Sequence, residues 1–172
     1  MENFAQVLAK YPYEKYNSAN YQQIGKVIYD FSGDGLADAQ QFARRLLVNI
    51  LLANGDAHLK NWSLLYQDQI TPRLSPAYDI VTTSVYIEGE MQYALNLGKM
   101  KEWFSVTGNN FQAWAEKSGI PWRANKPHID DTMEKARSLW PEALKDLPMD
   151  AEQKDKLKEH WGKLQSDFKI TQ

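Results

Sequence analysis

Residues 54–61 read Asn-Gly-Asp-Ala-His-Leu-Lys-Asn, a stretch dense in functional groups. The segment before it, 37–53, has apolar residues at helical spacing around a wide face. That pattern predicts a central, heavily buried helix. Asn-Gly is a common signal for a helix end, so we expect this helix to stop at residues 54–55. The polar loop would then be fixed to one end of the core.

Within this loop, Asp56 and Asn61 suit phosphoryl transfer. The Asp56 carboxylate could accept or orient the proton of an attacking hydroxyl, and the Asn61 amide oxygen could bind a magnesium ion that bridges ATP phosphates. Magnesium favours oxygen ligands and usually takes one or two carboxylates from a protein. Asp79 is the candidate carboxylate, because two strand-like segments between Asn61 and Asp79 predict a hairpin that returns Asp79 to the loop.

Each of these residues also has a simpler interpretation. Asp and Asn often cap and close turns, so an Asp-x4-Asn pair alone is a weak signal. His58 could contact the phosphates or brace the loop, and Lys60 could neutralise phosphate charge or be a solvated lysine. The candidate catalytic residues are Asp56, His58 and Lys60, and the candidate nucleotide and metal ligands are Asn61 and Asp79.

The rest of the chain predicts a mainly α fold with a small β-sheet beside the polar loop, an α+β class. Apolar stripes at helical spacing predict further helices over about 4–11, 21–31, 111–118, 129–140 and 153–168. Strand-like segments lie at 62–66, 73–74 and 91–97. Asn17 or Ser18 is placed to cap the helix over 21–31. Pro141 is placed to end the helix over 129–140, and Asp150 with Gln153 to cap the last helix.

The composition of the chain indicates the cellular location of the protein and the kinds of partner that it lacks. The 172 residues carry a net charge of −2, with 43% apolar residues, 24% charged residues and no cysteine. This predicts a globular protein without direct nucleic-acid binding, disulfides or thiolate metal sites. The longest apolar runs are far too short for a membrane span, and the first residues do not resemble a secretory signal. We therefore expect a cytoplasmic protein without a membrane partner.

The loop and a second segment together resemble a known family. Residues 54–61, followed by Leu-Ser-Pro-Ala-Tyr-Asp at 74–79, closely resemble the paired signature of HipA-like serine/threonine kinases, the toxins of bacterial toxin–antitoxin modules. The loop is also similar to the catalytic loops of phosphoinositide kinases and aminoglycoside phosphotransferases. The likeness is clearest over residues 1–119 and includes Lys15-Tyr16 and Arg44-Arg45.

The resemblance implies the C-terminal lobe of a protein-kinase-like fold over residues 1–172. It implies that Asp56 is the catalytic aspartate and that Asn61 and Asp79 bind the metal. The implied cofactors are ATP and Mg²⁺, and the implied substrate is a protein, often an aminoacyl-tRNA synthetase. A HipB-like antitoxin is the implied partner. Asn3 departs from the acidic residue usual at its position and receives no role.

A kinase of this kind also has an N-terminal lobe that covers and clamps the phosphates. Residues 1–55 contain no Gly-rich phosphate loop and no lysine in a Val-Ala-x-Lys context. We therefore expect the N-terminal lobe to be absent from this chain and a separate N-lobe chain to be a possible partner. The alternative is a catalytically incomplete lobe that acts as a partner-binding module or remains as a remnant.

Overall fold

The computed structural model describes residues 1–16, 18–89 and 92–171. Its α-helices are α1 (Phe4–Val7), α2 (Tyr21–Phe31), α3 (Gly35–Leu51), α4 (Gly108–Lys117), α5 (Trp122–Asp146) and α6 (Ala151–Lys163). Its strands are β1 (Glu2–Asn3), β2 (Ser63–Tyr66), β3 (Pro72–Leu74), β4 (Gln92–Leu97) and β5 (Met100–Glu102). Short 3-10 helices are η1 (Pro12–Glu14), η2 (Leu59–Asn61), η3 (Thr83–Val85) and η4 (Trp103–Ser105).

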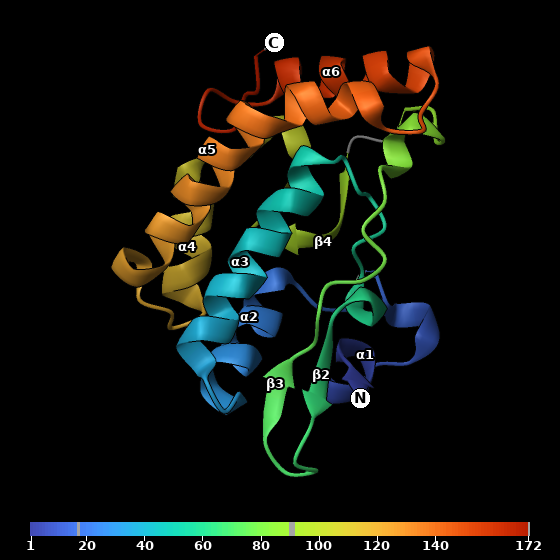
Figure 1. The fold of residues 1–172 in the computed structure, drawn as a ribbon. Helices are drawn as coiled ribbons and strands as arrows, with labels where there is room; N and C mark the ends of the chain where they lie inside the picture. The colour runs from blue at the N-terminus through green and yellow to red at the C-terminus, as the bar shows by residue number, and fades with distance from the viewer. Residues whose placement is uncertain (17, 90–91, 172) are drawn as a thin grey trace.

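α3 is the central element of the core. Figure 1 shows it running through the middle, with α4 and α5 on one side, the β2–β3 hairpin on the other and α6 across one end. Its Phe42, Leu46 and Ile50 side chains are buried, and the helix packs against both α2 and α5. Each such side chain contributes roughly 2 kcal/mol by leaving water. The predicted central helix is therefore confirmed.

Two small antiparallel sheets accompany the helices. β2 pairs with β1 on one side and with β3 on the other, where Leu64 lies opposite Leu74. A separate sheet pairs β4 with β5. The chain is 54% helical and has two small antiparallel sheets, which confirms the predicted α+β class. Among the described residues, no helix is long and apolar enough to cross a membrane.

The first two helices differ from the sequence prediction at their ends. α1 stops at Val7, a turn earlier than predicted, and Ala9 then takes a left-handed conformation with φ of 52°. α2 is capped by Asn20, whose side chain accepts a hydrogen bond from the third amide of the helix at 2.9 Å. Ser18 was therefore wrong as the cap, and the alternative, Asn17, lies outside the described residues.

α3 also ends before its predicted limit. Its last residue is Leu51, and Ala53 takes the left-handed conformation (φ 52°) that Asn54-Gly55 was expected to supply. This conformation costs a non-glycine residue about 1 kcal/mol. The amide of Asn54 donates to the carbonyl of Asn49 at 2.9 Å, which closes the helix end and directs the chain into the polar loop.

α5 continues through Pro141, where the sequence predicted its end. A proline inside a helix removes one backbone hydrogen bond. The helix persists because Ile129, Met133 and Ala136 before the proline and Leu144 after it are all buried in the core. Tertiary packing here outweighs the local preference of the sequence.

α6 closes the C-terminal end of α3. The predicted capping box is confirmed at its start, where the side chains of Asp150 and Gln153 each accept a hydrogen bond from the backbone amide of the other residue. From the opposite end of α6, His160 Nε2 donates to the carbonyl of Ile50 and Trp161 Nε1 to that of Leu51, both at 2.8 Å. The last carbonyls of a helix have no intrahelical hydrogen-bond partner, so these two contacts satisfy groups at the end of α3. Burial lowers the pKa of the neutral His160 to about 4.

We expect the chain to lose stability as the pH falls from about 6.5 to about 4. In that window the unfolded chain binds a proton at His160 that the folded chain excludes, so the free energy of unfolding falls by at most about 3 kcal/mol. Urea unfolding followed by tryptophan fluorescence measures this loss. The glutamine in His160→Gln keeps a hydrogen-bond donor but does not titrate. Between about pH 6.5 and about pH 4, this variant should therefore lose less stability than the wild type loses. An equal loss in both proteins would contradict the assignment.

The start of α3 is joined to β3 through one buried carboxylate. Asp38 accepts hydrogen bonds from Arg73 Nε at 2.9 Å, from Arg73 Nη2 at 3.0 Å and from the amide of Leu74 at 2.8 Å. The hydroxyl of Ser32 also donates to it. Asp38 is 5% exposed, so water cannot replace these partners. This contact fixes the hairpin that precedes Asp79.

Asp38→Asn should lower the free energy of unfolding by about 2 kcal/mol, because Arg73 and the Leu74 amide lose their charged acceptor. Urea denaturation measures the change. Asp130→Asn is the matched control, since Asp130 pairs with Lys126 on the exposed face of α5 and such a pair contributes little. Equal effects of the two substitutions would show that the Asp38 contact does not hold the hairpin.

Candidate active site

The polar loop is held to the end of α3 by the side chain of Asn54. This residue is 2% exposed. Its Nδ2 donates to Asn49 Oδ1 at 2.7 Å and to the carbonyl of Asp79 at 3.4 Å, and its Oδ1 accepts from the amide of Asp56 at 3.0 Å. One buried amide thus joins the helix, the loop and the segment that carries Asp79.

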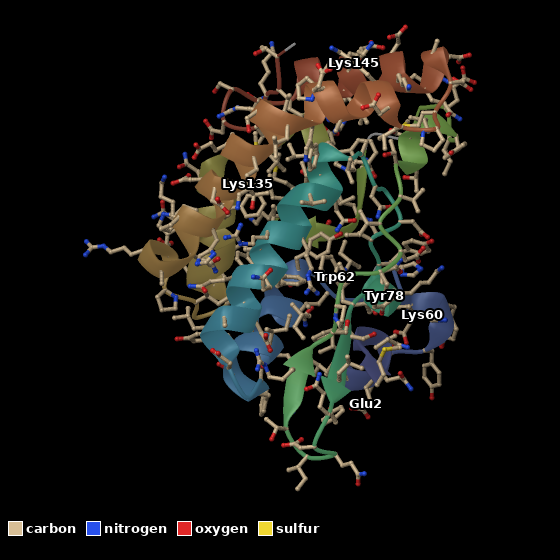
Figure 2. All side chains as sticks on the ribbon, viewed as in Figure 1. Glu2, Lys60, Trp62, Tyr78, Lys135 and Lys145 are labelled. Carbon is tan, nitrogen blue, oxygen red and sulfur yellow. The ribbon has the colours of Figure 1, made fainter. Side chains whose placement is uncertain are left out.

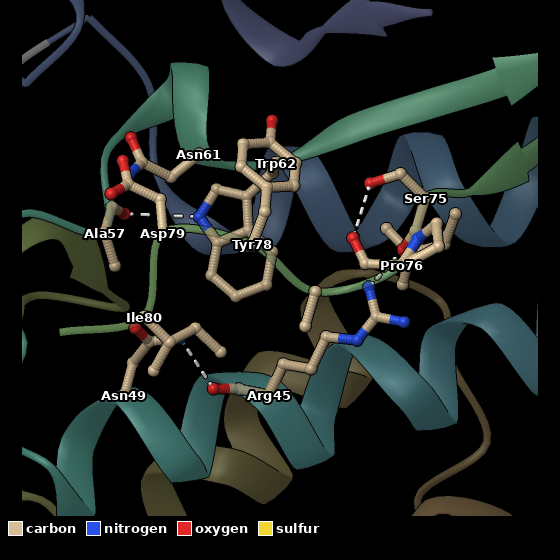
Figure 3. Close-up of a pocket in the computed structure, with 12 residues that line it drawn as sticks. Arg45, Asn49, Ala57, Asn61, Trp62, Ser75, Pro76, Tyr78, Asp79 and Ile80 are labelled. Carbon is tan, nitrogen blue, oxygen red and sulfur yellow. Dashed lines mark hydrogen bonds between the residues drawn. The ribbon is translucent and has the colours of Figure 1, made fainter.

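Further hydrogen bonds fix the middle of the loop. The amide of Gly55 donates to Thr83 Oγ1 at 2.8 Å. The carbonyl of Ala57 accepts from the hydroxyl of Tyr21 at 3.0 Å and from Trp62 Nε1 at 3.2 Å, the second of which is drawn in Figure 3. Since these partners come from α2, η3 and the residue before β2, the loop is built into the core.

The β2–β3 hairpin returns the chain to the loop, as the sequence predicted. Asn61, the last residue of η2, donates through Nδ2 to Asp79 Oδ2 at 2.5 Å. Figure 3 shows the two side chains next to each other. The predicted proximity of Asn61 and Asp79 is therefore confirmed, whereas their roles as ligands stay a prediction.

Asp79 has an uncommon backbone conformation, with φ of 56°. Aspartate tolerates the left-handed region better than most residues, but the conformation still stores strain. The hydrogen bonds from Asn61 and Asn54 hold it there. Such strain gathers at functional sites, where the surrounding structure over-determines one conformation.

The Asn61 and Asp79 side chains carry the kind of oxygen donors that a hydrated magnesium ion takes from a protein. Asn61 Oδ1 is buried without a hydrogen-bond partner, and Asp79 is exposed to solvent. Among the described residues, no group of three or more His, Cys, Asp and Glu side chains could hold a metal. An ion at this place would therefore have one carboxylate and one amide oxygen from the protein, which suits Mg²⁺ completed by water and phosphate oxygens.

A small pocket adjoins the two candidate ligands. Asn61 and Asp79 line it together with Arg45 and Asn49 of α3 and with Tyr78. Asp56 and His58 are not among its lining residues. Arg45 closes the opposite wall by donating from Nη1 to the carbonyl of Ser75.

Tyr78 connects the two segments of the signature. Its hydroxyl donates to the carbonyl of Lys60 at 2.8 Å and lies 2.5 Å from Ser63 Oγ. Figure 2 shows Lys60, Trp62 and Tyr78 near one another, on the side of the molecule that carries the β2–β3 hairpin. Within the described part of the chain, the exposed Lys60 ammonium has no hydrogen-bond or ion-pair partner.

Asp56 and His58 lie beside each other in the loop. Asp56 Oδ1 is 3.8 Å from His58 Nε2, and the Asp56 side chain is 47% exposed whereas that of His58 is 8% exposed. Burial is the main cause that lowers the pKa of His58, with a further contribution from Lys15, while Asp56 opposes the shift. The structure thus brings Asp56 and His58 into one loop with Asn61. The catalytic roles of Asp56, His58 and Lys60 stay predictions.

Four residues at this site had no role in the sequence prediction. Tyr16 donates to Asp56 Oδ1 at 2.6 Å, and Lys15 Nζ lies 2.8 Å from His58 Nε2. No spacing rule links residues so far apart in the chain. Asn49 and Asn54 also hold the site, and Asn49 did carry a signal, because it is a polar residue on the apolar face of the predicted helix.

Comparison with known proteins agrees with this architecture. A family model described as the HipA-like C-terminal domain matches residues 1–140. A protein of Sinorhizobium fredii named "Putative kinase Y4dM" is 39% identical over 160 residues, which are 93% of this chain and 39% of that protein. A "Putative kinase" of Haemophilus influenzae is 40% identical over 69 residues, 40% of this chain and 20% of that protein. The chain thus spans well under half the length of these relatives.

A solved structure has the same fold. It is described as the "Shewanella oneidensis MR-1 Toxin Antitoxin System HipA, HipB and its operator DNA complex". The match has a TM-score of 0.75 and 18% identity, and it covers 92% of this chain and 40% of the other. This likeness supports the kinase-like lobe that the sequence predicted. With its family model matched over residues 1–140, the chain belongs to the HipA-like C-terminal domain family.

Proposed function

We propose that this chain carries the catalytic and metal-binding half of an ATP-dependent kinase that phosphorylates serine or threonine hydroxyls of a protein. The observation that carries the proposal is the contact between Asn61 and Asp79, with the unpaired Asn61 Oδ1 beside it. Membership of the HipA-like family and relatives named as kinases support it.

In this proposal each side chain has a distinct task. Asp56 accepts the proton of the attacking hydroxyl, whose oxygen bonds to the γ-phosphorus while the bond to the β,γ-bridging oxygen breaks and ADP leaves. Asn61 Oδ1 and the Asp79 carboxylate hold Mg²⁺, which when bound neutralises charge on the phosphates. The exposed Lys60 ammonium adds positive charge near the phosphates, and the buried His58 braces the loop.

The remaining phosphate contacts come from outside these residues in our proposal. Residues 1–55 have no Gly-rich phosphate loop, and the chain spans 39% of its Sinorhizobium relative. We propose that an N-lobe outside residues 1–172, in the same polypeptide or in a separate chain, clamps the nucleotide. The structural neighbour is a complex of HipA with HipB and operator DNA, so a HipB-like antitoxin is the further partner that we propose.

The proposal is tested by Mg-ATP binding and by phosphoryl transfer. Calorimetry should detect heat from Mg-ATP with the chain, alone or mixed with a candidate N-lobe chain, and Asp79→Asn should weaken this binding at least about tenfold. Transfer of the labelled γ-phosphate to dephosphorylated casein should fall at least about 100-fold in Asp56→Asn, because the proton acceptor is lost. That variant should still bind Mg-ATP.

Asp130→Asn is the control, since Asp130 lies on the exposed face of α5 in an ion pair with Lys126. It should bind and transfer like the wild type. Labelled phosphate that persists unchanged in Asp56→Asn would refute the role of Asp56. Absence of any Mg-ATP heat, with or without the N-lobe chain, would favour a non-catalytic, partner-binding lobe.

A further inference from the structure

Two residues that precede α2 lie directly against the catalytic loop. The Tyr16 hydroxyl donates a hydrogen bond to Asp56 Oδ1 at 2.6 Å, although the two residues are 40 positions apart in the sequence. Lys15 Nζ lies 2.8 Å from His58 Nε2, and the carbonyl of Lys15 accepts from the amide of Leu59 at 3.4 Å. The Lys15–Tyr16 pair therefore contacts the loop through side chains and backbone together.

The contact with Lys15 indicates which ring nitrogen of His58 carries the proton. An ammonium group has hydrogen-bond donors and no acceptor, so the ring proton of His58 is assigned to Nδ1, which is buried without a hydrogen-bond partner, and Nε2 accepts from Lys15. The imidazole is consequently neutral. Because its Nε2 lone pair is occupied by Lys15, His58 supports the loop without competing with Asp56 for a substrate proton.

The rings in this cluster support one another. Lys15 Nζ lies 4.7 Å from the centre of the Tyr16 ring, and the Tyr16 and His58 rings meet edge to face with 5.1 Å between their centres. Both geometries are attractive. Lys15 and His58, which contact each other, thus both pack against the Tyr16 ring beside the loop.

The consequence for Asp56 concerns its two carboxylate oxygens. Oδ1 accepts from Tyr16 and lies 3.8 Å from His58 Nε2, whereas Oδ2 has no hydrogen-bond partner among the described residues. The side chain is half exposed, so without such a contact it would rotate freely. Fixing Oδ1 sets the direction of Oδ2 and leaves that oxygen open to an incoming hydroxyl.

We propose that Tyr16 is a positioning residue for the kinase reaction, and that Lys15 holds Tyr16 and His58 in place for it. The proposal rests on the proposed function, because it names how the proton acceptor of that reaction is oriented. Tyr16 binds one oxygen of Asp56 so that the other meets the substrate hydroxyl. Misplacing a reacting group by about 1 Å can cost up to about 100-fold in rate, so this contact matters chiefly for turnover.

The test compares Tyr16→Phe, Lys15→Met and the double variant in the casein assay, with the N-lobe chain present if the wild type needs it. Tyr16→Phe should lower kcat about tenfold while the KM for ATP stays within about twofold. Lys15→Met should act in the same direction, and the double variant should lose less than the product of the single effects because both act on one loop. The unfolding midpoint of Tyr16→Phe should stay within about 2 °C of the wild type.

Tyr13→Phe is the matched control. Tyr13 is in the same segment, is 81% exposed and stacks on Tyr11. Its substitution should leave kcat and KM unchanged. A Tyr16→Phe variant with wild-type or higher kcat would overturn the proposal, since higher activity would mean that the phenol blocks Asp56.

A second measurement needs no catalysis. Burial and then the hydrogen bond to Asp56 raise the pKa of Tyr16. In protein labelled at the tyrosine ζ-carbon, Asp56→Asn should lower the pKa of the Tyr16 signal, which Tyr16→Phe identifies by its loss. An unchanged pKa would refute the contact. The third outcome is a lowered Tyr16 pKa in Asp56→Asn together with no phosphate transfer by the wild type. This outcome would confirm the contact but refute the kinase function, and the positioning role with it.

Discussion

The site depends on the buried side-chain amide of Asn54. Its hydrogen bonds reach Asn49 on α3, the backbone of Asp56 in the loop and the carbonyl of Asp79 after the hairpin. Because this amide is removed from water, each lost partner would leave a buried polar group unsatisfied. The loop and the Asp79 segment are therefore held in register by the protein itself. A ligand would meet a site that is already formed.

The proximity of Asn61 and Asp79 was predictable from sequence because local rules governed it. A buried helix followed by Asn-Gly predicted a loop, and alternating segments on either side of a turn predicted the hairpin that returns Asp79 to Asn61. Both expectations are confirmed. The α+β class followed from the same periodicities, since burial of apolar stripes dominates the energy of α3 and its neighbours.

The features that sequence missed depend on tertiary contacts. Nothing near Lys15 and Tyr16 in the chain shows that they reach Asp56 and His58. Pro141 ends a helix by local preference, yet α5 continues because its face is buried against the core on both sides of the proline. Ala53 likewise takes a conformation usual for glycine, since the hydrogen bond that follows it closes α3. For Lys15, Tyr16 and α5, contacts distant in sequence decide the structure, whereas the turn at Ala53 depends on a hydrogen bond between Asn54 and Asn49.

Manganese binding tests most directly whether Asn61 and Asp79 hold a divalent ion. With a small amount of Mn²⁺ and ATP, the paramagnetic ion should broaden the amide NMR signals of residues around 61 and 79 before all others. Asp79→Asn should remove this selective broadening. Broadening centred on another part of the chain, or broadening that is the same in Asp79→Asn, would contradict the account.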